Sequence, residues 1–338
     1  MTDEAPSCLR TPPGRIPELT VISVTGSERV AFLNALITAD ILHLPTGSVR
    51  LVAWCDAKGR VERLLRLLIG DREIAILCRH DEREALTSRL NLFSLRRDVK
   101  IAPAEGWHVI TDTGPESGET PFADVVAGRF IGLTERPEPW RDVQGAWHAA
   151  EIACMVPLLP DTLRGEFLPQ MLNLEALDGL SYKKGCYPGQ EIIARLHFRG
   201  ELKRELALLE YTGGQPPSPG ATLTLAKEDS ADACENSQRA GQVTAVAKLD
   251  KLETGAVTEV RAGDANATAG TDGRTGQTAG EPTSALQSPY AATETAKQRV
   301  LVQAVITVGG QQTLHDASGQ PLRILKRQSA NAHFSPSH

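Results

Sequence analysis

Hydrophobic and polar positions follow a regular order in the first forty residues. Residues 18–24 alternate and are rich in β-branched side chains, which predicts a strand. Residues 25–28 then have the spacing of a capping box, Thr-Gly-Ser-Glu, which is typical of a helix start. Apolar residues recur at helical intervals beyond it and predict a helix that ends near residues 39–40. The apolar positions of this helix are Val30, Phe32, Leu33, Leu36 and Ile37.

Strand and helix patterns continue to alternate up to residue 102. Residues 81–93 predict a helix with Asp81 as its cap, and a turn is expected at 56–59. The further strands are predicted at 48–55, 60–69, 73–78 and 98–102. This order favours an α+β fold in which helices pack on an antiparallel sheet, near the ferredoxin-like pattern.

The second half of the chain predicts one helix and then a small β-barrel. Residues 147–155 have a helical pattern that ends before a proline. Short antiparallel strands are predicted at 205–211, 222–225, 241–248 and 299–308. Two polar inserts interrupt them, near 227–240 and 262–298, and we expect both to be flexible because they hold too few large apolar residues to form a core.

Three domains follow from these patterns. We predict an N-terminal α+β domain at 16–103, a central α+β domain at 104–200 and a C-terminal β-barrel at 201–327. Aromatic residues make up only 4% of the 338 positions, so the cores must be built mainly from Leu, Val, Ile and Ala.

Charge and cysteine usage exclude several classes of protein. The net charge of −6 disfavours broad nucleic-acid binding, so any contact with RNA must be indirect or confined to a patch. None of the six cysteines forms a C-x-x-C pair, which leaves a structural zinc site without support, and their scatter fits a reduced cytoplasmic protein. No apolar run is long enough to span a membrane, and residues 1–15 lack the apolar region of a secretory signal.

One stretch, residues 181–195, combines turn, charge and thiol chemistry. Cys186 lies between Gly185 and Gly189, and the pattern after it predicts the first turns of a helix from Glu191 with Ile192, Ile193 and Leu196 buried. A cysteine on a tight loop before a helix, preceded by two lysines, is favoured as the thiolate and is a candidate nucleophile, redox group or soft-metal ligand. The competing interpretation is an inert, buried thiol.

Basic residues are concentrated in the same region. Residues 181–204 contain six basic side chains and two acidic ones, which reverses the sign of the chain as a whole. Such a local positive field attracts carboxylates and phosphates.

These residues carry a resemblance to a known family. The sequence Lys-Gly-Cys-Tyr-Pro-Gly-Gln-Glu at 184–191 resembles the K-G-C-Y-x-G-Q-E signature of the YgfZ family, which is related to the T-protein of the glycine cleavage system. The flanks at 167–174 and 194–204 match as well. The shorter matches Cys-Asp-Ala-Lys-Gly-Arg at 55–60 and W-x3-E-I-x4-P at 147–157 extend the resemblance.

The resemblance implies a T-protein-like fold and a folate-binding accessory protein. Such a protein binds tetrahydrofolate or a derivative and supports iron–sulfur client or assembly proteins, including tRNA-thiolating enzymes. The resemblance implies that Cys186 is the reactive group. The face of a tryptophan suits a flat pterin or aminobenzoyl ring. Some members have a second tryptophan where this chain has Leu19. The implied cofactor-binding residues are Trp147, Lys184, Tyr187, Gln190, Glu191 and Arg195.

Two alternatives stay open. A folate-dependent aminomethyltransferase of the T-protein type needs a carboxylate near the folate, and Asp40 and Asp56 are the candidates. The other alternative is a non-catalytic scaffold that binds folate or a partner while the thiol is incidental. No metal-ligand cluster is predicted in either case.

Overall fold

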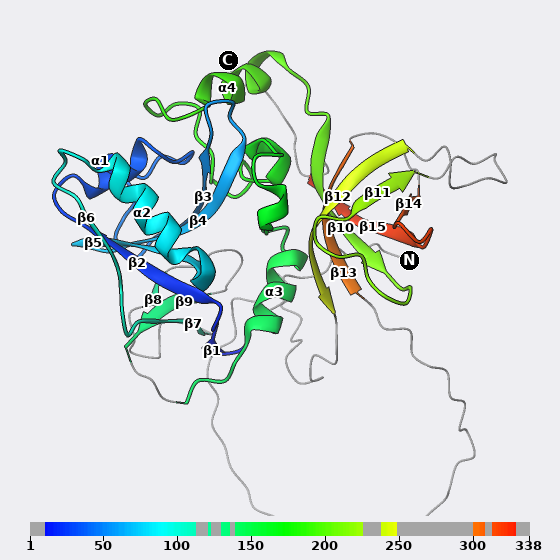
Figure 1. The fold of residues 1–338 in the computed structure, drawn as a ribbon, viewed down its shortest axis with the longest axis horizontal. Coiled ribbons are helices and arrows are strands. Elements are labelled where there is room, and N and C mark those ends of the chain that lie inside the picture. Colours follow the sequence, from blue (N-terminus) through cyan, green and yellow to red (C-terminus); the bar gives the residue numbers. More distant parts are fainter. Residues whose placement is uncertain are drawn as a thin grey trace, which may run out of the picture.

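The computed structural model describes residues 11–112, 121–122, 130–135, 139–225, 238–248, 300–307 and 313–328. Two antiparallel sheets with their helices and a closed barrel lie side by side, and α3 (Gln144–Ala153) lies between them (Figure 1). The predicted α+β layers and C-terminal antiparallel barrel are therefore confirmed.

The N-terminal sheet has five antiparallel strands in the order β3-β4-β5-β2-β6. The helices α1 (Arg29–Asn34) and α2 (Arg83–Phe93) cover one face, and the other face packs toward α3 and the barrel. Because both faces are buried, these strands have long apolar runs. The strands are β2 (Leu19–Thr25), β3 (Val49–Cys55), β4 (Val61–Ile69), β5 (Glu73–Arg79) and β6 (Lys100–Pro103).

The helix α1 is shorter than the sequence pattern predicts. It ends at Asn34 because the chain beyond it joins the sheet: Thr38 N donates to Ala53 O at 2.9 Å, and Ala53 N donates to Thr38 Oγ1 at 2.9 Å. The predicted capping box is wrong, because the residue before α1 makes no side-chain cap and Ser27 bonds to Asp98 instead. Tertiary contacts override the local signal here.

The predicted cap of the second helix is also wrong. A 3₁₀ turn, His80–Glu82, precedes α2, whose N-cap residue Glu82 makes no side-chain cap. The Asp81 carboxylate pairs with Arg79 at 2.5 Å instead, which also holds the pKa of Asp81 below its ordinary value.

A second sheet, of four strands, lies beside α3 in the order β1-β7-β9-β8. Its first strand, β1, precedes the predicted N-terminal domain in the sequence and pairs with β7. Trp147, on α3, packs into the core between the two sheets and is 2% exposed. The strands are β1 (Gly14–Arg15), β7 (His108–Asp112), β8 (Pro121–Phe122) and β9 (Phe130–Thr134).

The C-terminal part forms a closed six-stranded barrel in the order β10-β13-β12-β11-β14-β15. The last two strands were not predicted, because they are short or follow a polar segment. Of the two predicted flexible inserts, residues 238–240 belong to β12, and 227–237 and 262–298 lie outside the described residues. The strands are β10 (Arg204–Tyr211), β11 (Thr222–Leu225), β12 (Gln238–Lys248), β13 (Val300–Thr307), β14 (Leu314–His315) and β15 (Pro321–Arg327).

A buried glutamine joins the barrel to the segment after α3. Gln303, on β13, is fully buried; its amide donates to Val156 O at 2.9 Å and accepts from Leu158 N at 3.0 Å. Thr244 Oγ1 donates to the same side chain at 3.1 Å. Since these bonds satisfy polar groups in an apolar setting, they fix the barrel against the α3 layer. The predicted domain limits at 103 and 200 stay predictions, because one hydrophobic cluster runs across both.

Candidate functional site

The signature loop places Cys186 at the surface. Cys186 is exposed, whereas the other described cysteines, Cys55, Cys78 and Cys154, are buried. Burial raises the pKa of the Cys55 thiol strongly and raises that of Cys78 to about 12, so both are protonated at neutral pH. In the described part of the chain, Cys186 is thus the thiol that a reagent or partner in solution can reach.

Lys184 is buried and its ammonium group is fully engaged. Lys184 Nζ donates to the carbonyl oxygens of Asn34, Ile37 and Ala39 at 2.5, 2.8 and 2.7 Å. These carbonyls belong to the end of α1 and the chain after it, which lack helical donors. Burial lowers the pKa of Lys184 to about 8. The side chain therefore anchors the loop to the N-terminal layer, and its predicted contact with folate stays a prediction.

The two predicted folate contacts on either side of the turn also stabilise the loop. Tyr187 is buried, and its hydroxyl donates to Ser181 O at 3.2 Å; burial raises its pKa. Gln190 Nε2 donates to Lys184 O at 3.2 Å. Both bonds close the loop on itself, so that Cys186 projects from a braced turn.

The helix after the loop is confirmed, with two differences in its buried face. It is α4, Gln190–Arg199, and its N-cap residue Gly189 has a φ of 76°, a left-handed conformation that glycine adopts without strain. Ile193 is fully buried as predicted, but Ile192 is 37% exposed and Leu196 is only half-buried. Glu191 and Arg195 pair with each other at 2.7 Å on the outer face, both exposed.

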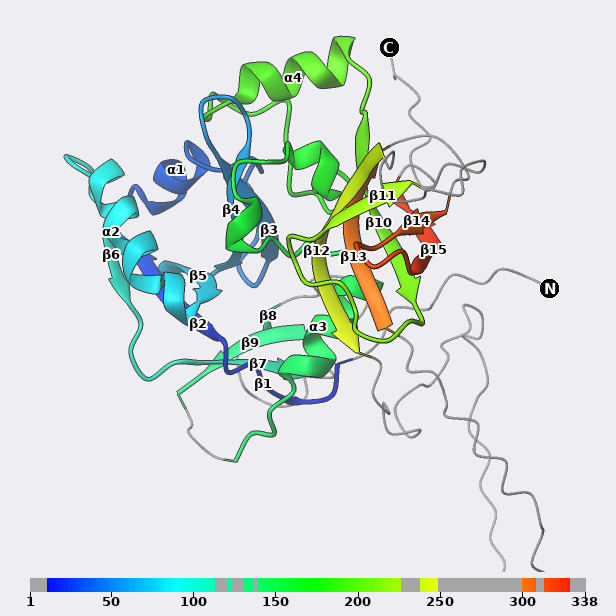
Figure 2. The ribbon, with the colours of Figure 1, turned by 45° about the vertical axis from the view of Figure 1, so that its right-hand side comes forward.

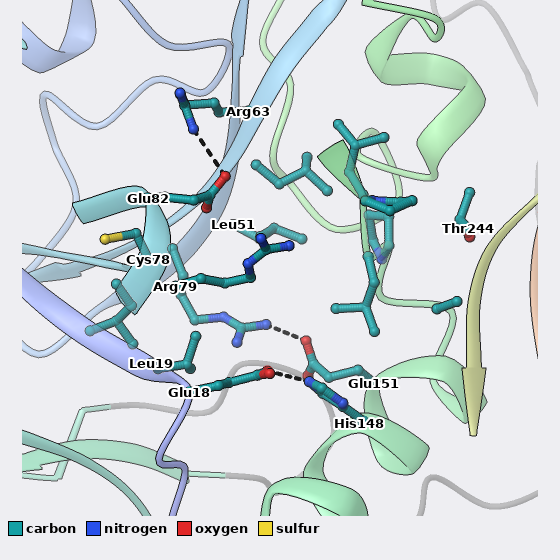
Figure 3. Close-up of a pocket in the computed structure, with 18 of the residues that line it drawn as sticks. Glu18, Leu19, Leu51, Arg63, Cys78, Arg79, Glu82, His148, Glu151 and Thr244 are labelled. Carbon is teal, nitrogen blue, oxygen red and sulfur yellow. Dashed lines mark hydrogen bonds and ion pairs between the residues drawn. The ribbon is translucent and has the colours of Figure 1, made fainter. Parts of the chain in front are cut away.

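A cavity of about 310 Å³ lies apart from this loop, between the N-terminal sheet, α3 and the barrel (Figure 3). Its apolar walls come from β2 to β5, the proline-rich segment after α3, and β12. Among the described residues that line it, none belongs to the signature at 181–195. The structure therefore separates the exposed thiol from the cavity. The apolar lining includes Leu19, Leu51, Leu64, Leu77, Pro157, Leu158, Leu159, Pro160 and Val246.

Two charged pairs that involve α3 lie in the cavity wall, and Figure 3 shows one of them, Glu18 beside His148. Arg66 Nη2 donates to Glu151 Oε2 at 2.6 Å, and both side chains are buried. His148 Nε2 pairs with Glu18 Oε1. The second carboxylate oxygen of Glu18, Oε2, accepts a hydrogen bond from Gln144 Nε2 at 3.0 Å. These groups are held in place by their partners, so the cavity presents a preorganised polar side opposite its apolar walls.

A third charged group lies at the edge of the cavity. Arg63 donates to Glu82 at 2.9 Å, and Arg164 pairs with the same carboxylate. Arg164 also reaches Asp161 at 2.7 Å. Burial lowers the pKa of both arginines.

The predicted ring contact, Trp147, lines the cavity together with Leu19. The Arg66 guanidinium lies over the indole ring, 5.0 Å from its centroid, so one face of Trp147 is already covered. Leu19 occupies a neighbouring part of the cavity wall. The structure thus brings these two predicted positions together and leaves Cys186, Lys184 and the α4 residues outside.

Sequence reasoning missed most of the polar side of the cavity. Arg66 carried a signal, because it is a lone charged residue inside the apolar run of β4, and Glu151 was noticed only as part of a motif. Glu18 and His148 carried none, since they are 130 positions apart and meet only in the folded chain.

Two kinds of feature are absent from the described residues. They contain no group of three or more His, Cys, Asp or Glu side chains arranged to hold a metal ion. None of their helices combines the length and apolar character needed to cross a membrane.

Comparison with known proteins gives similar sequences and a similar fold. The chain is 30% identical over 269 residues to the tRNA-modifying protein YgfZ of Escherichia coli O157:H7, covering 70% of this chain and 81% of that protein. It is 28% identical over 270 residues to the protein of the same name from Shigella sonnei, with the same two shares. The fold is similar to the crystal structure of glycine cleavage system aminomethyltransferase T from Bartonella henselae, with a TM-score of 0.59, 12% identity, and coverage of 94% and 85% of the two chains. No protein-family model matches the chain.

Proposed function

Because this chain belongs to the family of the tRNA-modifying protein YgfZ, we propose that it is a folate-binding accessory protein of iron–sulfur enzymes, including those that thiolate tRNA. It acts in the cytoplasm on iron–sulfur client or assembly proteins. The observation that carries the proposal is the cavity beside Trp147, together with an exposed Cys186 outside it.

The cavity suits the ring system of a reduced folate in size and in chemistry. Its volume of about 310 Å³ is at the lower end of the range typical of small-molecule sites. The apolar walls accommodate a flat ring, and the Arg66–Glu151 pair and His148 offer donors and acceptors to a heterocycle's polar edge. Trp147 and Leu19 would hold the ring system. When bound, a reduced folate supplies one-carbon or two-electron chemistry.

Cys186 is proposed as the reactive group toward client proteins. Its exposure gives a partner direct access, and the braced loop fixes its position. Cys55 and Cys78 are unsuited to this role because burial keeps both thiols protonated. The role of folate would then be exerted from a separate site.

An aminomethyltransferase has less support. Asp56 accepts hydrogen bonds from Lys58 N and Arg60 N, both at 2.8 Å, and so stabilises the turn in which it lies. Asp40 accepts from Leu42 N at 3.1 Å. Neither aspartate lines the cavity, and the likeness to an aminomethyltransferase shows the fold alone.

Calorimetric titration with tetrahydrofolate tests the cavity. We expect one site per chain, and binding about two- to tenfold weaker in Trp147→Phe, because the phenyl ring offers a smaller face to the ligand than the indole and ring contacts are worth about 0.5–1.5 kcal/mol. Trp54→Phe is the matched control: Trp54 is also buried and lies under an arginine, Arg89 at 5.4 Å, but it does not line the cavity. Equal loss in both variants, or no binding by the unaltered chain, would refute the folate site.

A rescue experiment tests the thiol. Cells that lack the protein and have low iron–sulfur enzyme activity should recover with the unaltered chain but not with Cys186→Ser. Tetrahydrofolate should bind that variant normally. Cys154→Ser serves as the control for loss of a described thiol, since Cys154 is buried. Full rescue by Cys186→Ser would favour the scaffold alternative.

A further inference from the structure

The helix α4 forms part of the outer edge of the molecule in both ribbon views (Figures 1 and 2). Its inner side is anchored by the buried Ile193. Its outer side exposes Ile192, Arg195, Phe198 and Arg199. This surface, which we call the α4 face, takes no part in the cavity and is not explained by folate binding.

Positive charge on and around the α4 face is largely uncompensated. Arg199 is exposed on the last turn of the helix, and Lys203 and Arg204 are exposed just after it. Lys183 is exposed on the loop that also carries Cys186. None of these four forms an ion pair with another described residue, whereas Arg195 pairs with Glu191. A chain of net charge −6 thus maintains a cationic surface here, which attracts polyanions.

An exposed aromatic ring, Phe198, lies on the same last turn of α4 as Arg199. Phe198 is 70% exposed, and its ring meets those of His197 and Tyr182 edge-on, at centroid distances of 4.7 and 6.2 Å. The rings of His197 and Tyr182 stack on each other, with their centroids 3.7 Å apart. Tyr182 is fixed in turn by a hydrogen bond to Glu175 at 3.1 Å. Phe198 is therefore held in place by the other two rings and open to solvent. Exposing an apolar ring to water costs free energy unless a ligand covers it.

We propose that the α4 face binds single-stranded RNA, with Phe198 stacking on a base and Arg199, Lys203 and Arg204 contacting phosphates. Cations flanking an open aromatic ring match the arrangement by which proteins hold unpaired nucleotides. A protein partner would require a wider apolar centre. Here the strongly exposed apolar group of the α4 face is Phe198, and Ile192 is only 37% exposed.

Fluorescence anisotropy with a labelled oligouridine RNA of about 12 nucleotides, a length that one such site can cover, tests the proposal. We expect a dissociation constant on the order of 10 µM at low salt, which weakens as salt rises from about 50 to 200 mM. Phe198→Ala should weaken binding at least about fivefold, because a stacked base is lost. Arg199→Ala should reduce the slope of log K against log salt by about 0.7, because one phosphate contact is lost.

The turn that follows α2 provides matched controls. Leu95 is 73% exposed and Arg96 is exposed beside it, so Leu95→Ala and Arg96→Ala remove similar groups from a different surface. Both controls should bind RNA like the unaltered chain. A duplex RNA of the same length should bind more weakly, because its bases are not free to stack.

Three results would overturn the proposal: no binding at low salt, equal effects of the α4 and α2 variants, or equal binding of a polyglutamate peptide with the same loss in Phe198→Ala. The last result would assign the surface to an acidic protein instead. Tetrahydrofolate binding should be unchanged in every variant, so this test fails or succeeds independently of the cavity.

Discussion

Gly59 and Gly189 lie against each other so closely that Gly189 has no room for a larger residue and a side chain at Gly59 would be tightly packed. A Cβ atom at Gly189 would come within 2.3 Å of Gly59 Cα and 2.6 Å of Asp56 O. A Cβ atom at Gly59 would meet Gly189 O at 3.0 Å. The two positions belong to the turn at 56–59 and to the signature loop, so two motifs far apart in sequence form one contact that seats the Cys186 loop on the β3–β4 hairpin.

Gly189→Ala should destabilise the protein. The substitution adds a backbone clash to a residue whose φ is 76°, and we expect a loss of about 1–3 kcal/mol in the free energy of unfolding, measured by urea denaturation. Gly185→Ala is the control, because a Cβ atom there has no neighbour within 4 Å and its φ is not positive. Similar stabilities for the two variants would contradict the contact.

The buried ammonium of Lys184 should make stability depend on pH. Its pKa falls from an ordinary 10.5 to about 8 through burial, so the unfolded chain binds more protons between these values. The unfolding free energy of the unaltered chain, relative to Lys184→Met, should therefore be level below about pH 8. It should then rise by at most about 3 kcal/mol up to pH 10.5. A difference that stays level across this range would show that the lysine titrates normally.

The buried Arg66–Glu151 pair should show strong coupling. Glu151→Leu leaves the guanidinium buried without its 2.6 Å partner, and we expect it to cost roughly 3–5 kcal/mol in chemical denaturation. Adding Arg66→Met should recover much of that loss, because the second charge is removed as well. Glu191→Leu, which breaks the exposed pair with Arg195, should change stability by less than about 1 kcal/mol. Additive effects at Arg66 and Glu151 would disprove the coupling.

Leu19→Trp should strengthen folate binding if the cavity is the folate site. The side chain lines the cavity and its replacement adds an aromatic wall near Trp147. We expect binding about two- to tenfold tighter by calorimetry, the range of one additional ring contact. Leu77→Trp, on another wall of the cavity where the residue is buried, should reduce binding by overpacking. A Leu19→Trp variant that folds normally and binds less tightly would argue against a ring at this wall.

Local patterns predicted the layers of the fold, because strands buried on both faces leave unmistakable apolar runs. β4, for example, is marked by the leucines around Arg66. They failed where distant contacts decide the local structure. The helix at Arg29 was predicted too long, since the pairing of Thr38 with Ala53 ends the helical pattern and no helical periodicity records it.

The site was predictable only where its parts are neighbours in sequence. The turn, the thiol and α4 follow one another, so the signature revealed them together. The role of Lys184 could not be foreseen, because its three carbonyl partners lie between 145 and 150 positions away. The cavity was equally hidden, since β2, α3 and β12 each supply one wall.

The closure of the barrel has a consequence for synthesis on the ribosome. β10 pairs with β13 on one side and with β15 on the other, and the ion pairs Arg327–Glu205 and Arg323–Glu210 tie the ends together. Nascent β10 must therefore wait for β13, whose paired residues are made 89 to 103 positions later, while the N-terminal layers have all their strands early. Folding during translation should proceed in two stages, with the final ring sealed only after Arg327 has left the exit tunnel.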